Sequence, residues 1–169
     1  MGKVKIVGRV VIVTGPVSTG RSWLAYKMMQ AHNNESCVTV SFCRANPNNA
    51  TMLDALLKAQ KKIEDSLMSN IFTIISTKRM TYESLRALIV SLRVMGYKDK
   101  ITVVKMNLSE ELHMDFWRRN HDKAKISLNK LRRERANFEA ILADNNFGDK
   151  DVISVKIDNP DDVSFEFCD

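Results

Sequence analysis

The segment Gly15–Ser22 (GPVSTGRS) has the residue types and spacing that hold phosphate groups. It matches the pattern G-x-x-x-x-G-K-[ST] at every fixed position except one, where Arg21 replaces the lysine. Glycines let backbone N–H groups approach phosphate oxygens, and the start of a helix adds partial positive charge. The Ser22 hydroxyl would ligate Mg²⁺. The expected phosphate-binding residues of this glycine loop (residues 15–22) are Gly15, Ser18, Thr19, Gly20, Arg21 and Ser22. The alternative is a glycine-containing turn that holds no ligand.

The elements around the glycine loop are those the pattern requires. The apolar run Val10–Thr14 predicts a buried strand, and a helical pattern follows over Ser22–Ala31. The same alternation continues along the chain. Further strands are predicted over Cys37–Cys43, Ile71–Ser76, Ile101–Met106 and Val152–Ile157. Further helices are predicted over Ala50–Met68, Tyr82–Met95 and Ile126–Ala143, and another is predicted to begin at Ser109. Strands that are apolar on both faces and alternate with helices predict an α/β fold of three α/β/α layers around a mainly parallel, five-stranded sheet.

The length and composition suit a single globular domain. The chain has 169 residues, of which 44% are hydrophobic and 27% charged. We expect one domain over residues 1–158, with a helical lid at about 109–135, and an acidic C-terminal tail over 159–169. No apolar run approaches the roughly 18 residues that span a bilayer, so no membrane partner is expected. The three scattered cysteines form neither a CxxC pair nor a disulfide framework, which predicts a reducing, cytoplasmic location.

The charge is distributed unevenly along the chain. Residues 1–138 hold 24 Lys and Arg against 11 Asp and Glu, whereas residues 139–169 hold 2 against 9. Eight of the basic residues fall within 117–135. A basic region of this kind suits a polyanion such as a nucleotide or a nucleic-acid single strand or 5′ end. The alternative is a solvated helix face that binds nothing.

Three segments together resemble the P-loop kinase superfamily, and within it the bacteriophage polynucleotide 5′-kinases. The first is the glycine loop. The second is Phe72–Met80, followed by a helix that ends in Met95-Gly96-Tyr97 and by the strand at 101–106. The third is Trp117-Arg-Arg-Asn-His121, followed by Ile126, Leu131 and Phe138-Glu139, which is similar to the family's lid pattern R-N-x-H … I … F-E.

This resemblance implies a P-loop NTPase-like domain that transfers the γ-phosphoryl of ATP (or GTP), with Mg²⁺, to a nucleic-acid 5′-hydroxyl. It also implies roles for individual residues. Arg21 and Arg119 would have catalytic roles, because phosphoryl transfer depends on cations that stabilise developing oxygen charge. Ser22 would bind the metal. The acceptor side would consist of Ser41, Arg44, Arg118 and His121.

The chain departs from the family pattern at three places. Ser41 stands where the family has an aspartate base, Thr77-Lys78-Arg79 replaces an Asp-Thr-Asn-like triplet, and Arg21 replaces lysine. The nearest carboxylates that could substitute for the base are Asp54 and Glu83. Two hypotheses therefore stay open: an active polynucleotide-kinase-like enzyme, or a catalytically dead pseudokinase that binds nucleotide or nucleic acid. The acceptor, the choice between ATP and GTP and the oligomeric state stay open too.

Overall fold

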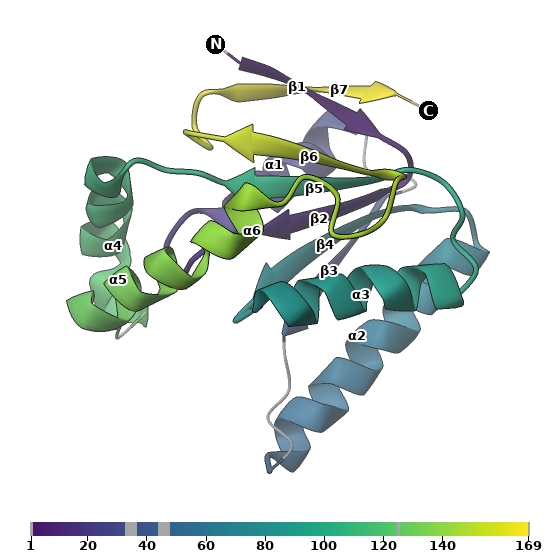
Figure 1. The fold of residues 1–169 in the computed structure, drawn as a ribbon, viewed down its shortest axis with the longest axis horizontal. Helices are drawn as coiled ribbons and strands as arrows, with labels where there is room; N and C mark the ends of the chain where they lie inside the picture. Colours follow the sequence, from purple (N-terminus) through teal and green to yellow (C-terminus); the bar gives the residue numbers. More distant parts are fainter. Residues whose placement is uncertain (1, 33–36, 44–47, 125, 169) are drawn as a thin grey trace.

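The computed structural model describes residues 2–32, 37–43, 48–124 and 126–168, which form seven strands and six helices (Figure 1). The strands are β1 (Gly2–Val7), β2 (Val10–Thr14), β3 (Cys37–Cys43), β4 (Phe72–Lys78), β5 (Ile101–Met106), β6 (Val152–Ile157) and β7 (Val163–Cys168). The helices are α1 (Arg21–Ala31), α2 (Ala50–Met68), α3 (Tyr82–Val94), α4 (Glu110–Ala124), α5 (Leu128–Asn137) and α6 (Glu139–Ala143).

The main sheet has the strand order β3-β4-β2-β5-β6, and all of its pairings are parallel. This confirms the expected three-layer α/β fold with a five-stranded parallel sheet. The central strands β2 and β5 are buried along their whole length, which explains why their sequences are mostly apolar rather than alternating. The chain leaves β2 toward β3 on one side and later crosses to β5 on the other. The end of β2 is therefore a switch point, where open α/β sheets place their ligands.

Two apolar cores cover the two faces of the sheet. On one face, side chains of α2, α3 and α6 pack against alternate residues of β2, β4 and β5. On the other, α1 and Phe116 of α4 share a core with β1 and β7. Capping side chains fix the starts of two helices: Asn49 accepts a hydrogen bond from the N–H of Met52 in α2, and Thr81 accepts one from that of Ser84 in α3.

Part of the segment expected to be an acidic tail is a strand. β7 pairs in parallel with β1, from Gly2 opposite Val163 to Val7 opposite Cys168, so the first and last strands lie side by side, with the N- and C-termini at opposite ends of the pair (Figure 1). His32 stacks on Phe72 of β4, with 4.1 Å between ring centroids, and meets the ring of Phe167 edge-on at 4.9 Å. These aromatic contacts fasten β7 to the main sheet. The division into a domain and a tail stays a prediction.

The single helix expected over 126–143 is wrong. The chain instead forms α5 and α6 with Phe138 between them. Phe138 is 5% exposed and sits with Ile141 in the core that faces α3. Its carbonyl accepts hydrogen bonds from both Ile141 and Leu142, at 3.0 Å each. The chain turns here because two apolar side chains must reach the sheet while the earlier part of α5 stays charged and exposed.

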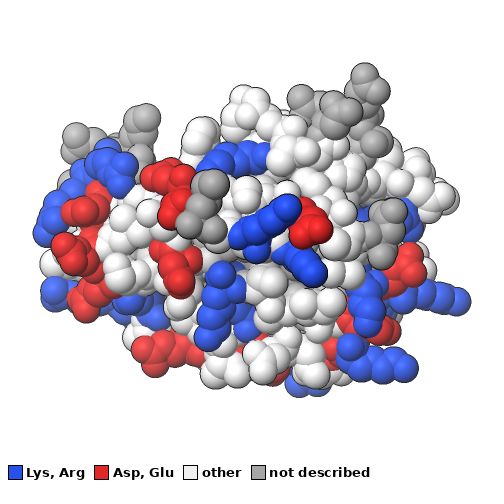
Figure 2. Space-filling view, turned by 90° about the horizontal axis from the view of Figure 1, so that it is seen from above, with Lys and Arg blue, Asp and Glu red and all other residues white. Residues whose placement is uncertain are grey.

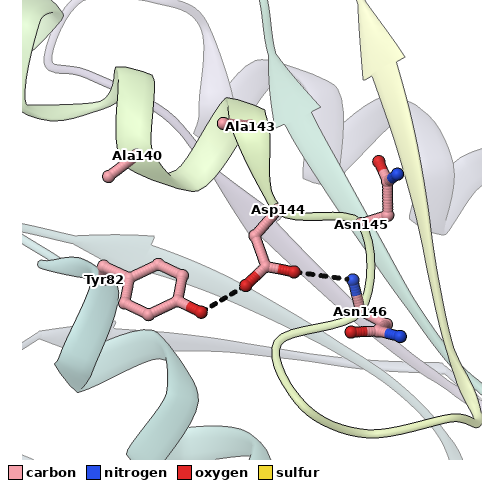
Figure 3. A pocket seen from close by; sticks show the side chains of 6 residues that line it. All are labelled: Tyr82, Ala140, Ala143, Asp144, Asn145 and Asn146. Atoms are coloured by element: carbon pink, nitrogen blue, oxygen red, sulfur yellow. Dashed lines mark hydrogen bonds between the residues drawn. The ribbon is translucent and has the colours of Figure 1, made fainter.

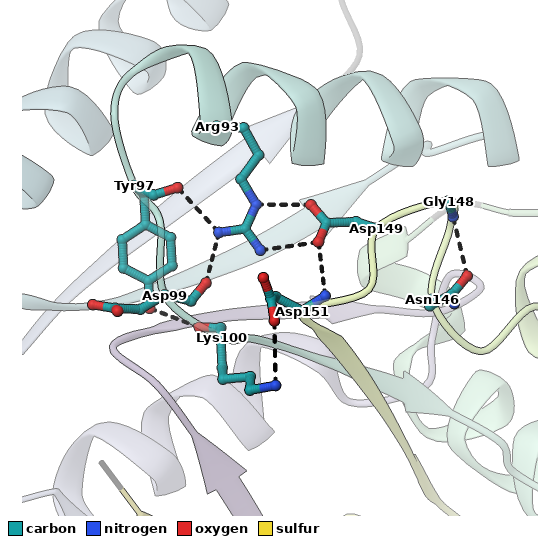
Figure 4. Close-up of polar contacts among 8 residues, drawn as sticks. All are labelled: Arg93, Tyr97, Asp99, Lys100, Asn146, Gly148, Asp149 and Asp151. Carbon is teal, nitrogen blue, oxygen red and sulfur yellow. Dashed lines mark hydrogen bonds and ion pairs between the residues drawn. The ribbon is translucent and has the colours of Figure 1, made fainter.

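A polar cluster connects α3 to the segment before β6 (Figure 4). The Arg93 guanidinium binds Asp149 through two hydrogen bonds, 2.7 and 3.2 Å long, and also donates to the carbonyls of Tyr97 and Asp99. Lys100 forms an ion pair with Asp151 at 3.3 Å. The Arg93 hydrogen bonds lower the pKa of Asp149 below its ordinary value.

Among the helices of the described ranges, none combines the length and apolar character needed to cross a bilayer.

Candidate functional site

The glycine loop runs from the end of β2 to the first turn of α1, at the switch point of the sheet. Ser18 (φ 61°) and Gly20 (φ 84°) both have left-handed backbone conformations, and Gly20 precedes the first helical residue. The Thr19 hydroxyl donates to the carbonyl of Pro16 at 2.7 Å and closes the loop on itself. The N–H groups of the first helical turn have no partner within the helix and are therefore donors for an anion.

Two positions of the loop admit only glycine. A Cβ on Gly15 would lie 2.6 Å from Cβ of Met106 on β5, a distance that side chains do not tolerate. A Cβ on Gly20 would lie 3.2 Å from Pro160 and 3.5 Å from the ring of Phe116, at a φ that already disfavours any side chain. Both glycines of the motif are thus required by close approach of the backbone to its neighbours.

Two neighbouring residues of α5 hold the loop residue Val17, one directly and one through His113. The carboxylate of Glu134 accepts a hydrogen bond from the Val17 N–H at 3.1 Å. Arg135 lies 3.4 Å from Nδ1 of His113, whose Nε2 is 2.7 Å from the Val17 carbonyl. Since Arg135 can only donate, Nε2 of His113 carries the proton and donates it to Val17. Burial lowers the pKa of His113, in keeping with a neutral ring.

Arg21 lies across the carboxyl ends of two strands. Its Nη1 donates to the carbonyl of Gly15 at 2.9 Å and to that of Thr77, at the end of β4, at 2.8 Å. Burial lowers the pKa of Arg21, and the charge of Glu134 partly opposes that shift. An arginine ordinarily titrates so far above neutral pH that this guanidinium keeps its charge. The loop therefore has a fixed cation beside it.

A cavity of about 450 Å³ opens beside the loop, a size that holds small ligands in many proteins. We call it the loop cavity. Its lining residues come from the loop, from the β4–α3 connection and from α5 and α6: Gly15, Pro16, Arg79, Met80, Thr81, Tyr82, Glu83, Lys130, Glu134, Asn137, Phe138 and Ala140. Arg79 has φ 55°, a left-handed conformation that is strained for a bulky residue. The cavity thus combines two cations, two carboxylates and an apolar floor.

A second, more open hollow of about 570 Å³ shares Tyr82 and Ala140 with the loop cavity (Figure 3). The Tyr82 hydroxyl donates to Asp144, whose other oxygen accepts from the backbone N–H groups of Asn146 and Phe147. The hydrogen bond from Tyr82 lowers the pKa of Asp144, and the same bond raises the pKa of Tyr82. These contacts fix the Tyr82 ring between the two hollows.

Lys105 on β5 supports the wall of this second hollow from the interior of the protein. Its side chain is fully buried and its Nζ donates to the carbonyl of Asp144, at the end of α6. The ammonium also lies 5.0 Å from the centroid of the Phe147 ring. Burial lowers the pKa of Lys105 to about 8, with a smaller contribution from the charge of Lys156.

The structure brings some of the expected site residues together and separates others. The six loop residues adjoin one another, and the exposed Ser22 lies in the first turn of α1. Arg119 stacks over the ring of Phe116, which borders Gly20, whereas Arg118 pairs with Asp115 on the exposed side of α4. Ser41 is exposed. It lies on the opposite face of β3 from Val40 and Phe42, and it is not part of the loop cavity. Arg44 and the side chain of His121 lie outside the described residues.

Several residues of the site were not expected from the sequence. Glu134, His113 and Arg135 hold the loop, while Arg79, Tyr82 and Lys130 line the cavity. His113 and Glu134 lie 96 and 117 residues from Val17 along the chain, so no local pattern connects them. Within the described residues there is no group of three or more His, Cys, Asp or Glu side chains that could hold a metal ion.

Comparisons with known proteins support the fold. No family model and no curated protein matches this chain. Among solved structures, it is similar to a protein described as a "putative kinase" from Chloroflexus aurantiacus J-10-fl. The TM-score is 0.58 and the sequence identity 9%, over 92% of this chain and 91% of the other. At that identity the likeness concerns the fold. The narrower resemblance to bacteriophage polynucleotide 5′-kinases stays a prediction.

Proposed function

We propose that this protein binds a nucleoside triphosphate with Mg²⁺ at the glycine loop and transfers its γ-phosphoryl group to an acceptor in the loop cavity. The observation that carries the proposal is the geometry of the loop at the switch point. Two left-handed residues and two required glycines turn the chain into the start of α1, with a half-buried arginine beside it. This geometry suits the binding of a phosphate chain.

Residues of the loop would hold the donor. The N–H groups of the first turn of α1 would bind phosphate oxygens, and Arg21 would offset their charge. Ser22 would supply its hydroxyl to Mg²⁺, whose other ligands would be phosphate and water oxygens, as is common for this ion. When bound, Mg²⁺ would neutralise charge on the transferring group.

The acceptor would lie in the loop cavity with Glu83 as its base. Asp54 is paired with Lys58 at 3.0 Å on the exposed face of α2, and it does not line the cavity. Glu83 does line the cavity, together with Gly15 and Pro16. In the transfer, the acceptor oxygen bonds to the γ-phosphorus as the bond to the bridging oxygen breaks. The hydroxyl proton passes to Glu83, and the nucleoside diphosphate leaves.

A nucleic-acid 5′-hydroxyl is the acceptor that the lid pattern favours. Arg119, held over Phe116 next to Gly20, would reach the transferring phosphate from α4. Arg118 and the exposed cations of α5 would contact the polynucleotide backbone. Figure 2 views the molecule from above the orientation of Figure 1. On that face, acidic side chains lie among the basic ones at the end formed by α4 and α5, so the charge there is mixed and not purely basic.

The alternative is a pseudokinase, and one contact favours it. Thr77, which stands where the family has an aspartate, is buried and donates its hydroxyl to the Val13 carbonyl at 2.9 Å. It joins β4 to β2 and offers no carboxylate. In this alternative the protein holds nucleotide or nucleic acid without turnover.

One experiment separates the three outcomes. A Mg·ATP binding isotherm is measured beside transfer of labelled phosphate from ATP to 5′-hydroxyl oligonucleotides. Binding with transfer supports the kinase, and binding without transfer supports the pseudokinase. If neither Mg·ATP nor Mg·GTP, titrated in the same way, binds to the protein, the kinase and a nucleotide-binding pseudokinase are both contradicted.

A further inference from the structure

Glu134 directly, and Arg135 through His113, hold the two backbone polar groups of Val17, its N–H and its C=O. Glu134 accepts from the N–H at 3.1 Å, and Arg135 positions His113, which donates to the carbonyl. Arg135 is itself fixed by a 2.8 Å hydrogen bond from its guanidinium to the Leu108 carbonyl. Two adjacent residues of α5 therefore fix the backbone in the middle of the glycine loop.

The Glu134 contact is that of an anion in an anion-binding loop. A carboxylate resembles a phosphate in its charge and in its oxygen acceptors, and N–H groups at a loop-to-helix turn attract either. Glu134 is also close enough to Arg21 for its charge to oppose the lowering of the Arg21 pKa. The carboxylate thus already interacts with a donor and a cation that a bound phosphate would use.

We propose that Glu134 is an internal competitor for the nucleotide phosphates, which must displace its carboxylate from the loop before they bind fully. This inference rests on the proposed function and concerns the regulation of the same site.

The surroundings of Glu134 provide an alternative position for its carboxylate after displacement from the loop. Glu134 also lines the loop cavity, as do Arg79 of the β4–α3 connection and Glu83 of α3, and Lys130 lies one helical turn before it on α5. Rotation away from Val17 would place the negative charge near Lys130, in the space assigned to the acceptor. Binding of the donor would then change the charge that the acceptor meets, and the two substrates would be coupled through one side chain.

The test compares wild-type protein with Glu134→Gln and Glu134→Ala by calorimetry, with Mg·ATP and inorganic tripolyphosphate as probes. Removing a charged competitor should tighten binding of both probes by about tenfold. The matched control is Glu64→Gln, which removes the same charge from an exposed position on α2 and should leave affinity unchanged. In the absence of probe, Glu134→Ala should melt at a lower temperature, because the loop loses a contact. Glu134→Gln should melt only slightly lower, because its amide oxygen can still accept from Val17 but carries no charge.

Opposite signs of the two effects distinguish a competitor from a structural support. If the variants lose stability and also bind the probes more weakly or equally, Glu134 merely shapes the loop and the inference is wrong. If wild type and both variants all fail to bind either probe, the proposed function itself fails, and the inference falls with it. Wild-type binding without any gain in the variants overturns the inference alone.

Discussion

The carboxylate of Glu134 accepts a hydrogen bond from the backbone N–H of Val17 across 117 residues of chain. This contact connects α5, part of the region expected to form a lid, directly to the glycine loop. The loop is therefore supported from two sides: by β5, which forces glycine at position 15, and by α5, which holds Val17. A ligand at the loop would meet groups from both sides.

Glu83 should be required for transfer if the protein is active. Glu83→Gln keeps the size of the side chain but removes the proton acceptor, so the transfer rate should fall by about 10²–10⁴ while Mg·ATP affinity stays unchanged. Asp54→Asn is the matched control and should have no effect, because Asp54 lies outside the loop cavity. A full rate in Glu83→Gln would show that another group accepts the proton.

Lys105 should make stability depend on pH in the alkaline range. Its folded pKa, about 8, is below the ordinary value of 10.5, so the unfolded state binds more protons between these values. The free energy of unfolding of wild type, relative to Lys105→Met, should therefore rise by about 2 kcal/mol from pH 7 to pH 10. Urea unfolding of both proteins at the two pH values measures it. If wild type and Lys105→Met differed in free energy of unfolding by the same amount at both pH values, Lys105 would have an ordinary pKa, and the prediction would be wrong.

The ion pair between Arg93 and Asp149 should stabilise the fold at neutral pH. Both side chains are largely buried, at 22% and 19% exposure, and the pair is bidentate. Asp149→Asn should cost about 2 kcal/mol at pH 7. Because the folded pKa of Asp149 is lowered, its contribution is complete above the ordinary aspartate pKa and fades as the pH falls through the lower folded value. Urea unfolding at pH 7 and at pH 3 should show the difference shrinking; a constant difference would contradict this.

The exposed cations of α5 should bind single-stranded nucleic acid in a salt-dependent way. Each phosphate contact contributes about −0.7 to the slope of log affinity against log salt. The double variant Arg132→Ala, Arg133→Ala should reduce that slope by about 1.4, measured by anisotropy of a labelled oligonucleotide. An affinity that does not change between low and moderate salt would remove nucleic acid from the partners.

The sequence was sufficient to predict the main sheet and the glycine loop. β2, β4 and β5 are buried on both faces, so their sequences are mostly apolar and do not alternate with exposed polar residues. The loop follows from local spacing alone. The pair β1–β7 was missed because its sequences are only half apolar. The alternation of Val4 with Ile6 and of Phe165 with Phe167 was the available signal.

Most of the surroundings of the loop could not be predicted from local patterns. In the sequence, Glu134 is one of two acids within the basic run 117–135, and no local motif includes His113. Their roles depend on the way α4 and α5 fold back on the loop. The spacing of residues in the sequence does not predict that arrangement. Arg79 acquires its place in the cavity from a left-handed backbone conformation that a bulky residue rarely adopts. The break at Phe138 was missed because a continuous helical pattern does not show where the core requires a turn.

The most direct test of the account is calorimetric titration of Mg·ATP into wild type, Arg21→Ala and Arg21→Lys, with Lys61→Ala on the exposed face of α2 as control. A charged contact to phosphate predicts an affinity at least about tenfold weaker in Arg21→Ala, a smaller loss in Arg21→Lys and none in Lys61→Ala. Circular dichroism melts would establish that the variants are folded. No binding by wild type, or equal binding by folded Arg21→Ala, would contradict the assignment of the glycine loop as a triphosphate site.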